Sequence, residues 1–315
     1  MVELAVKVGG LSLANPVMPA SGTFAEGLAQ VFDFNRLGAF VIKTVTRELR
    51  LGNPTPRVAE TPGGMLNSIG IPSKGVPPFF DDTLPFYRQF TPPLIVSISA
   101  PTAEGFASLA AELSVAGVAA IEANISCPNL EADGRAFAMT AEMTATVVKR
   151  LRRSTKLPLW AKLTPNTGDI AEVARAAEAN GADAVVVANT LLGMAIDTAS
   201  FRPRLGSVTG GLSGPAIKPV ILRQVHQCAR AVKLDIIGCG GISRAEDAVE
   251  YLLAGARAVQ VGTATFLHPT ALIEVIEGLK RFCVQRRIAR IGDLTGALHR
   301  EGADETDVEW AEAGQ

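Results

Sequence analysis

The sequence is poor in the residues that build metal clusters, disulfide frameworks and histidine-based sites. Its 315 residues include 4 cysteines and 3 histidines, and no two cysteines stand at C-x-x-C spacing. This argues against structural zinc and against an iron–sulfur cluster held by this chain alone. So few cysteines in a chain of this length also argue against a disulfide framework. We expect no histidine-based acid–base chemistry, because no histidine ends a predicted strand.

An excess of charge and long apolar runs are also missing. The formal net charge is −1 and the pI is about 6.4, which is not the signature of a nucleic-acid binder. No uninterrupted apolar stretch approaches the roughly 20 residues of a membrane helix, and Met1–Ala14 lacks the pattern of a secretory signal. We therefore expect a cytoplasmic protein. The sequence also has no strand–GxGxxG–helix unit, so a dinucleotide is not the expected cofactor.

Small and branched apolar residues are abundant. Apolar residues make up 48% of the chain and aromatic residues only 5%, which suits parallel strands buried on both faces. Eight short apolar runs alternate with helical patterns, which predicts a (β/α)8 TIM barrel formed by a single domain, residues 1–315. The predicted strands are Val17–Ser21, Phe40–Val45, Leu94–Ser99, Ala120–Ser126, Leu159–Thr164, Ala184–Thr190, Asp235–Cys239 and Ala258–Thr263. The predicted helices include Ala103–Ala116, Thr140–Arg153, Asp169–Asn180, Pro215–Val232 and Arg244–Ala254.

Three segments exceed a minimal barrel. Met1–Asn15 has the pattern of a short hairpin with Gly9-Gly10 at its turn, which we expect to close the lower end of the barrel. Arg47–Gln89 follows the second strand and Leu191–Ser213 follows the sixth. Loops of this length are usually functional, and both leave the carboxyl ends of strands, where barrel active sites lie.

Two lysines, Lys43 and Lys162, stand inside otherwise apolar strands. A buried lysine is costly unless it meets an anion, and for a single lysine we favour an internal ion pair, with Glu122 as a candidate by strand parity. Two lysines near one rim favour a bound anion or an electron-rich ring such as a reduced flavin.

Glycines end the last two predicted strands, at Gly240-Gly241 and at Gly262, which Thr263 follows. Glycine lets backbone N–H groups approach a phosphate, and barrels often bind phosphate at this point. Turns need glycine in any case, so each one alone is weak support. Their shared location favours a mononucleotide cofactor.

Four asparagines are expected near the same rim: Asn67, Asn124, Asn129 and Asn189. A carboxamide offers a donor and an acceptor together, which matches a planar imide such as a pyrimidine ring. A turn or cap role is the alternative, and we favour it for Asn129 taken alone. Asn124 and Asn189 fit that alternative less well because strands disfavour asparagine.

Cys127 is the candidate base, because it follows the fourth strand in a Ser-Cys-Pro turn. The alternative is a buried, inert thiol, which is what we expect of Cys228 and Cys283 on helical segments and of Cys239 between two glycines. At the ordinary thiol pKa of about 8.5, only a few per cent is thiolate at neutral pH. Catalysis should therefore improve towards alkaline pH unless the site lowers that pKa.

The combination of motifs resembles the catalytic chain of class 1B dihydroorotate dehydrogenases. The resemblance covers nearly the whole chain in order, and the Gly64–Gly70 segment resembles class 1B rather than class 1A. Class 2 enzymes use serine where this chain has Cys127. The matching segments are Ala20–Phe24, Lys43–Thr46, Gly52–Pro54, Gly63–Gly70, Asn124–Asn129, Lys162–Asn166, Asn189–Thr190, Gly210–Pro219, Gly240–Ile242 and Val259–Gly262.

The resemblance implies a role for each matching residue. Cys127 would take the C5 proton of dihydroorotate while the C6 hydride passes to N5 of FMN, with orotate as the product in pyrimidine (UMP) biosynthesis. The implied substrate-binding residues are Lys43, Asn67, Ser68, Ile69, Gly70, Ile71, Asn124, Asn129, Asn189 and Thr190. The implied FMN-binding residues are Ser21, Lys43, Thr44, Ser97, Asn124, Lys162, Ala188, Gly214, Gly240, Gly241, Gly262 and Thr263. No metal is implied.

The resemblance also implies partners: a second copy of the chain, and an electron-transfer subunit that carries FAD and a 2Fe–2S cluster and passes electrons to NAD. The chain's lack of a cluster motif and of a dinucleotide motif independently predicts an external electron acceptor. The sequence departs from the family in having Ala123 and Ala188 where we expect bulkier apolar residues.

Three alternatives remain from the sequence. A dihydropyrimidine dehydrogenase-type barrel would share the fold, FMN and the cysteine, but Asn129 after Pro128 favours orotate. A tRNA dihydrouridine synthase should show a basic RNA-binding surface. In a flavin electron-transfer module, Cys127 would be inert.

Overall fold

The computed structural model describes residues 2–126 and 136–299. Eight parallel strands form one sheet in the order β3-β16-β15-β10-β9-β8-β7-β4. The two outer strands of this order also meet, because the backbone N–H of Gly38 donates to the carbonyl of Val17 at 2.9 Å. The sheet is therefore a nearly closed barrel, as the alternating pattern predicted. Its strands are β3 (Val17–Pro19), β4 (Phe40–Val41), β7 (Leu94–Ile98), β8 (Ala120–Ala123), β9 (Leu159–Lys162), β10 (Ala184–Val187), β15 (Asp235–Cys239) and β16 (Ala256–Val261).

The helices around the barrel begin at polar caps and bury an apolar stripe. Thr102 and Thr140 accept backbone N–H groups at the first turns of α3 and α4, and Asp169 does so for α5. In α4 the buried positions 144, 147, 148 and 151 follow the helical period. The helices are α1 (Val76–Pro78), α2 (Leu84–Tyr87), α3 (Ala103–Leu113), α4 (Ala141–Ser154), α5 (Ile170–Ala179), α6 (Lys218–Ala231), α7 (Ala245–Leu253), α8 (Ala264–Leu267) and α9 (Ala271–Arg286). Shorter helical turns are η1 (Glu26–Gln30), η2 (Phe34–Arg36), η3 (Phe79–Thr83), η4 (Phe137–Met139), η5 (Pro215–Ile217), η6 (Ile291–Leu294) and η7 (Ala297–His299).

The N-terminal hairpin closes one end of the barrel, as the sequence predicted. Strands β1 (Val6–Val8) and β2 (Leu11–Leu13) pair antiparallel, and Val8 and Leu13 pack against the apolar barrel interior. At the turn, Gly9 adopts φ +52° and its carbonyl accepts the indole N–H of Trp160 at 2.9 Å. A side chain on Gly9 would collide with that indole, so only glycine fits there.

The two long segments that follow the second and sixth barrel strands pair with each other. They form a four-stranded antiparallel sheet in the order β11-β14-β6-β5, built from β5 (Val58–Thr61), β6 (Gly64–Asn67), β11 (Leu191–Gly193) and β14 (Gly210–Ser213). We call this the upper sheet. Residues 76–87 of the first segment are helical (α1, η3 and α2), whereas their sequence pattern predicted a connection without helices. Their prolines at 77, 78 and 85 hide the helical pattern.

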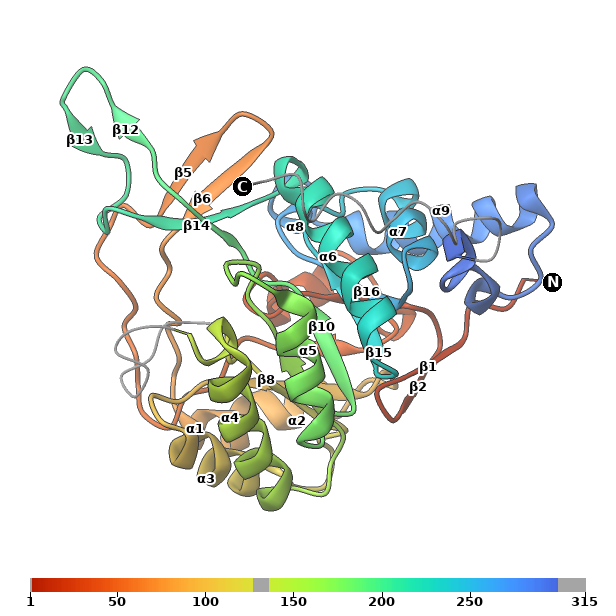
Figure 1. Cartoon of the computed structure of the whole chain (residues 1–315), viewed down its shortest axis with the longest axis horizontal. Coiled ribbons are helices and arrows are strands. Elements are labelled where there is room, and N and C mark those ends of the chain that lie inside the picture. Colours follow the sequence, from red (N-terminus) through yellow and green to blue (C-terminus); the bar gives the residue numbers. More distant parts are fainter. Residues whose placement is uncertain (1, 127–135, 300–315) are drawn as a thin grey trace.

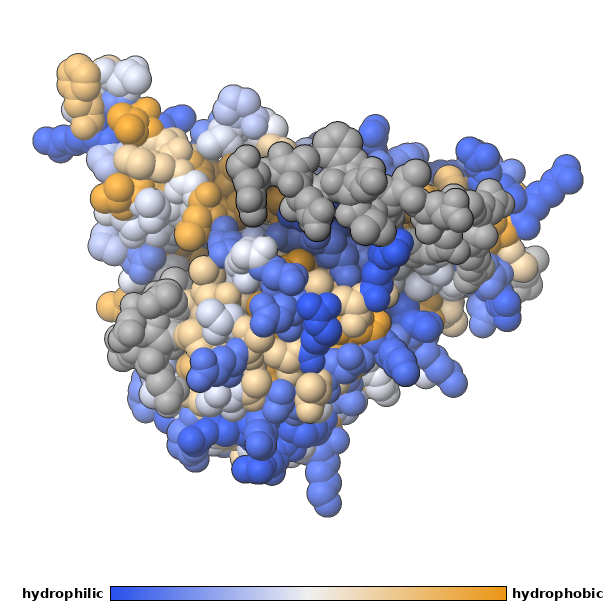
Figure 2. Space-filling view, viewed as in Figure 1, coloured by the Kyte–Doolittle hydropathy of each residue, from blue (hydrophilic) through white to orange (hydrophobic). Residues whose placement is uncertain are grey.

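A second hairpin projects from the upper sheet, formed by β12 (Ile196–Asp197) and β13 (Arg202–Pro203) (Figure 1). Apolar side chains gather over this projection (Figure 2). Phe201 is 88% exposed, and Leu192, Met194 and Ile196 are exposed as well. Such a cluster is typical of a surface that meets another protein.

The thiols expected to be inert are buried. Cys228 lies on α6 and Cys283 on α9, and both side chains are fully covered. Burial raises the pKa of the Cys228 thiol to about 12, which keeps it protonated. Among residues 2–126 and 136–299, no helix has both the length and the apolar character that crossing a membrane requires.

Candidate active site

A polar layer caps the apolar interior of the barrel. Glu122 of β8, Lys162 of β9 and Gln260 of β16 are buried and joined: Nε2 of Gln260 donates to Glu122 Oε2 at 2.6 Å, and Lys162 Nζ donates to Gln260 Oε1 at 3.2 Å. Lys162 Nζ lies 3.9 Å from Glu122 Oε1. The ion pair that strand parity suggested is therefore present, but the hydrogen bonds that join its two residues pass through Gln260.

The turn after β3 lies between the two lysines that the sequence singled out. Lys162 Nζ lies 3.4 Å from the hydroxyl of Ser21. A side chain on the next residue, Gly22, would lie 3.4 Å from Nζ of Lys43. Both ammonium groups thus meet the same turn at the carboxyl rim, as expected for a site that takes an anionic group.

Two buried hydroxyls lie side by side at the barrel, and one of them is next to Lys43 in sequence. Thr44, which follows Lys43, and Ser97 of β7 share a hydrogen bond of 2.9 Å between their oxygens. Both side chains are buried. On the other side of the barrel, the backbone N–H of Ala188 donates to the carbonyl of Cys239 at 2.9 Å. Burial raises the pKa of the Cys239 thiol, and the charge of Lys162 opposes that rise only in part.

The carboxamides at the ends of β8 and β10 are linked through one hydroxyl. Asn189 Nδ2 donates to Ser126 Oγ at 2.7 Å, and Ser126 Oγ donates to Asn124 Oδ1 at 2.7 Å. The backbone N–H of Thr190 donates to Asn189 Oδ1 at 2.8 Å. Asn166 supports this end of the loop by donating to the carbonyl of Thr190 at 3.0 Å. These bonds fix the direction of both asparagine side chains.

The upper sheet brings Asn67 to the same place. Asn67 Nδ2 donates to the carbonyl of Gly211 at 3.2 Å, and a side chain on Gly211 would collide with Thr190. The series of contacts that begins at Asn124 and passes through Asn189 and Thr190 therefore continues across Gly211 to Asn67. Three of the four predicted asparagines converge.

The loop that follows Asn67 is held by Asn53. Its Nδ2 donates to Ser68 Oγ at 2.8 Å, and its backbone N–H donates to the carbonyl of Ile69 at 3.1 Å. Gly70 packs so closely on Asn53 that a side chain would lie 2.4 Å from Oδ1. Ile71 adopts φ +50°, which is rare for a β-branched residue and is typical of functional sites.

Glycines and hydroxyls meet where β15 and β16 end. Gly241 adopts φ +68°, and a side chain there would lie 2.9 Å from the carbonyl oxygen of Gly214. Thr263 Oγ1 donates to Ser213 Oγ at 2.8 Å. The carbonyl of Gly240 accepts the hydroxyl of Tyr251 at 2.6 Å.

Gly262 completes this side of the rim, since a side chain on it would lie 3.4 Å from Cβ of Ala20 beside the Ser21 turn. The described residues thus join bare backbone, several hydroxyls, two ammonium groups and oriented carboxamides. This donor set fits a planar, anionic, phosphorylated cofactor with a planar polar substrate beside it. Two predicted residues, Cys127 and Asn129, lie outside the described residues.

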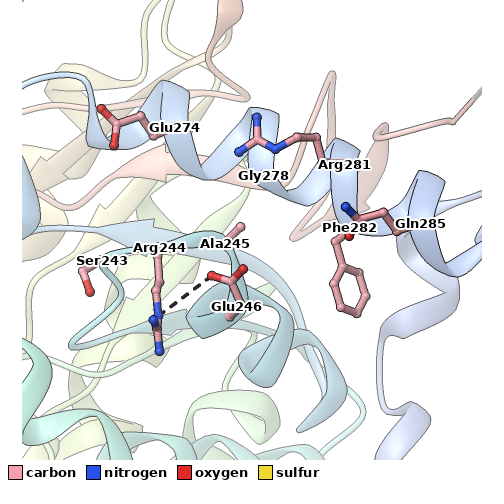
Figure 3. A pocket seen from close by; sticks show the side chains of 9 residues that line it. All are labelled: Ser243, Arg244, Ala245, Glu246, Glu274, Gly278, Arg281, Phe282 and Gln285. Atoms are coloured by element: carbon pink, nitrogen blue, oxygen red, sulfur yellow. Dashed lines mark ion pairs between the residues drawn. The ribbon is translucent and has the colours of Figure 1, made fainter.

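A separate hollow of about 280 Å³ lies between α7 and α9 (Figure 3). Its lining includes Arg244, Glu246 and Arg281, and Arg244 Nε lies 3.9 Å from Glu246 Oε2. None of its lining residues belongs to the predicted site. The hollow contains charges of both signs and does not indicate a ligand.

Comparison with known proteins assigns the family. The profile described as dihydroorotate dehydrogenase matches residues 3–283. The chain belongs to the dihydroorotate dehydrogenase family. It is 50% identical over 301 residues to "Dihydroorotate dehydrogenase B (NAD(+)), catalytic subunit" of Desulforamulus reducens, covering 95% of this chain and 99% of that protein. The protein of the same name from Trichlorobacter lovleyi is 50% identical over 298 residues, covering 94% and 98%.

A solved structure supports the fold. The crystal structure of Eimeria tenella DHODH in complex with ferulenol superposes with a TM-score of 0.77 at 22% identity, covering 95% of this chain and 89% of that one. At this identity the likeness shows the fold alone. Two predictions from the sequence are therefore confirmed: the barrel fold, and the resemblance of the chain to the class 1B dihydroorotate dehydrogenases.

Three residues that the structure joins to the candidate site were not among the predicted site residues. Ser126 bridges the two strand-end asparagines, Asn166 holds the Thr190 loop, and Gln260 joins Lys162 to Glu122. All three lie within segments that resemble the family, so the sequence contained a signal for them. Gln260 also stands in an apolar strand, which is the same pattern that identified Lys162.

Proposed function

We propose that the chain oxidises dihydroorotate to orotate in pyrimidine biosynthesis, as the catalytic subunit of an NAD-linked enzyme. The names of its relatives, which match over nearly their whole length, support this reaction. The observation that carries the proposal is the linked chain Asn124–Ser126–Asn189 at the barrel rim. It would present oriented carboxamides to a planar imide group, which the ring of dihydroorotate contains.

The cofactor in this proposal is FMN. Enzymes of this family depend on a flavin, and the rim offers the groups that FMN requires. The glycine turns at 214, 240–241 and 262 with the Thr263 hydroxyl would hold the phosphate, and Lys43 and Lys162 would face the ring. When bound, FMN would supply a two-electron acceptor for the hydride that leaves C6 of the substrate.

The base in this proposal is Cys127, which lies outside the described residues. It follows Ser126 directly in the sequence, and Ser126 is fixed by hydrogen bonds on both sides. The Cys127 thiolate would take the C5 proton, and the C5–H bonding pair would form the C5=C6 double bond as the C6 hydride leaves. Atoms and charge balance, since the thiolate becomes a neutral thiol and one negative charge would leave with the hydride to the cofactor.

Substrate binding in this proposal uses three sides of the rim. Asn124 and Asn189 would bind the imide, and Lys43 would offset the charge of the substrate carboxylate. The segment 67–71 of the upper sheet and the loop after it would cover the ring and exclude water, together with Thr190 and Asn129. Exclusion of water strengthens each of these charge contacts.

Two partners complete the proposal. The relatives are named catalytic subunits of NAD(+) enzymes, which supports a separate electron-transfer subunit; we infer that it carries FAD and a 2Fe–2S cluster. The exposed apolar residues of the projecting hairpin, Phe201 above all, support a homodimer. Sedimentation of the purified chain measures whether it is a monomer or a dimer. As the sequence led us to expect, we also propose that the reaction takes place in the cytoplasm.

Product formation tests the proposed function. The purified chain is supplied with FMN and an artificial electron acceptor, and orotate is measured after adding dihydroorotate. We expect turnover of dihydroorotate and none of dihydrouracil, which has the same ring without the carboxylate. Turnover of dihydrouracil alone would instead assign the chain to the dihydropyrimidine dehydrogenase type.

A further inference from the structure

Below the rim, two buried residues of the polar layer have no role in the proposed reaction. Glu122 and Gln260 are both 0% exposed. Their strands, β8 and β16, stand four places apart in the eight-strand order, so the Gln260 side chain meets Glu122 across the barrel. Burying two polar side chains costs stability, and the hydrogen bond between them offsets only part of that cost. We therefore expect a role of this pair in the position of Lys162.

Gln260 separates two opposite charges. Its carboxamide donates to Glu122 at 2.6 Å and accepts from Lys162 at 3.2 Å. The direct distance between Lys162 Nζ and Glu122 Oε1 is 3.9 Å, whereas a charge-assisted hydrogen bond is about 2.7–2.9 Å. Glu122 Oε1 accepts no hydrogen bond from the described part of the chain. The carboxylate can therefore attract the ammonium further inward.

On its other side, Lys162 meets the rim. Nζ lies 3.4 Å from the hydroxyl of Ser21, on the turn that also approaches Lys43. Cys239, also beside Lys162, is a neutral thiol, because burial raises its pKa. Among the described residues, Glu122 is thus a negative charge that competes with the rim for this ammonium.

We propose that Gln260 is a positioning residue that keeps the Lys162 ammonium away from Glu122 and directed at the flavin. The proposal rests on the proposed function, since it requires bound FMN. A positive charge at this place favours the reduced flavin, which is more negative than the oxidised form, by Coulomb attraction. Gln260 would therefore strengthen FMN binding, and more so after reduction.

Replacement of Gln260 by leucine tests this role. In Gln260→Leu the ammonium should close onto Glu122, and we expect about tenfold weaker binding of oxidised FMN, the loss typical of one buried polar contact. Reduced FMN should lose about a further tenfold, which corresponds to a midpoint potential about 30 mV more negative for a two-electron couple. Fluorescence titration of the FMN-free chain and a redox titration measure the two effects.

A matched control is available outside the barrel. Gln224 on α6 is 4% exposed, and its Nε2 donates to the carbonyl of Pro165 at 3.0 Å. Gln224→Leu removes a buried carboxamide of the same size. We expect it to change thermal stability without changing the FMN dissociation constant or the midpoint potential.

A second background separates positioning from general structural support. If Gln260 acts through Lys162, then Gln260→Leu should weaken FMN binding by less than about twofold in a Lys162→Met chain, because coupled residues are not additive. An equal loss in both backgrounds would overturn the proposal, as would unchanged binding and potential in a folded Gln260→Leu chain. Gln260→Met replaces the leucine variant if that variant does not fold.

The two proposals fail in different ways. If the unaltered chain takes up no FMN, the proposed function fails. If the unaltered chain binds FMN and the Gln260 variants bind it equally well, only the positioning role fails.

Discussion

The Gly241 turn offers the sharpest test of the phosphate side of the site. Gly241 adopts φ +68°, in the left-handed region. The Cβ of an alanine there would lie 2.8 Å from Cβ of Lys218, 2.9 Å from the carbonyl oxygen of Gly214 and 3.0 Å from the backbone nitrogen of Lys218. Two of these three atoms belong to backbone, so the turn itself must shift in Gly241→Ala.

The cost follows from two separate effects. A left-handed conformation costs an L-residue about 1–2 kcal/mol, and overpacking a close contact costs about 1–3 kcal/mol. We expect Gly241→Ala to lower the free energy of unfolding by about 2–5 kcal/mol in total. The same shift moves the N–H groups proposed to bind the phosphate, so FMN affinity should fall as well.

Urea unfolding and FMN titration measure both effects. Gly168→Ala is the matched control, because an alanine Cβ at position 168 would have no heavy atom within 4 Å. If Gly241→Ala and Gly168→Ala gave the same free energy of unfolding and the same FMN dissociation constant, the reasoning would be wrong.

Three further predictions follow from single residues. Cys127→Ser should keep FMN but lose at least about 100-fold in kcat, because a general base contributes about 10²–10⁴-fold; unchanged kinetics would reject the base. Lys162→Ala should weaken FMN retention, and an unaltered FMN-to-protein ratio after purification would contradict its place beside the cofactor. Burial alone would raise the pKa of Asp247, but hydrogen bonds from Lys218 and Ser243 lower it below its ordinary value. A depressed pKa stabilises the fold above the unfolded pKa, and this stability is lost as pH falls through the folded pKa. Asp247→Asn should therefore lower Tm at pH 7, and the difference in Tm between the variant and the unaltered chain should shrink below about pH 4. A difference in Tm that stays constant with pH would contradict the stabilising role of the Asp247 carboxylate.

The strands could be predicted from the sequence because their apolar runs are continuous, but their carboxyl ends could not. The fourth strand was predicted to reach Ser126, whereas β8 ends at Ala123. Ile125 extends the apolar run and is fully buried, yet its N–H donates to the carbonyl of Ala123 within a turn. Burial alone does not distinguish a strand from a turn packed on the core.

The contacts of the site could be predicted where they join neighbouring strands. Lys162 and Glu122 lie on adjacent strands, so parity alone brought them together. Gln260 reaches Glu122 from the opposite strand, and no local pattern predicts contacts across a barrel. Asn67 depends on the pairing of β6 with β14, which joins two distant segments. Long-range pairing of this kind is set by the closed fold rather than by local sequence.

Reduction of the bound flavin tests the central claim, oxidation of dihydroorotate by this chain, most directly. The purified chain with FMN is mixed under anaerobic conditions with dihydroorotate and, separately, with dihydrouracil, and the flavin absorbance is followed. We expect rapid bleaching by dihydroorotate only, without any partner subunit. Bleaching by dihydrouracil alone, or a bound flavin that neither compound bleaches, would contradict it.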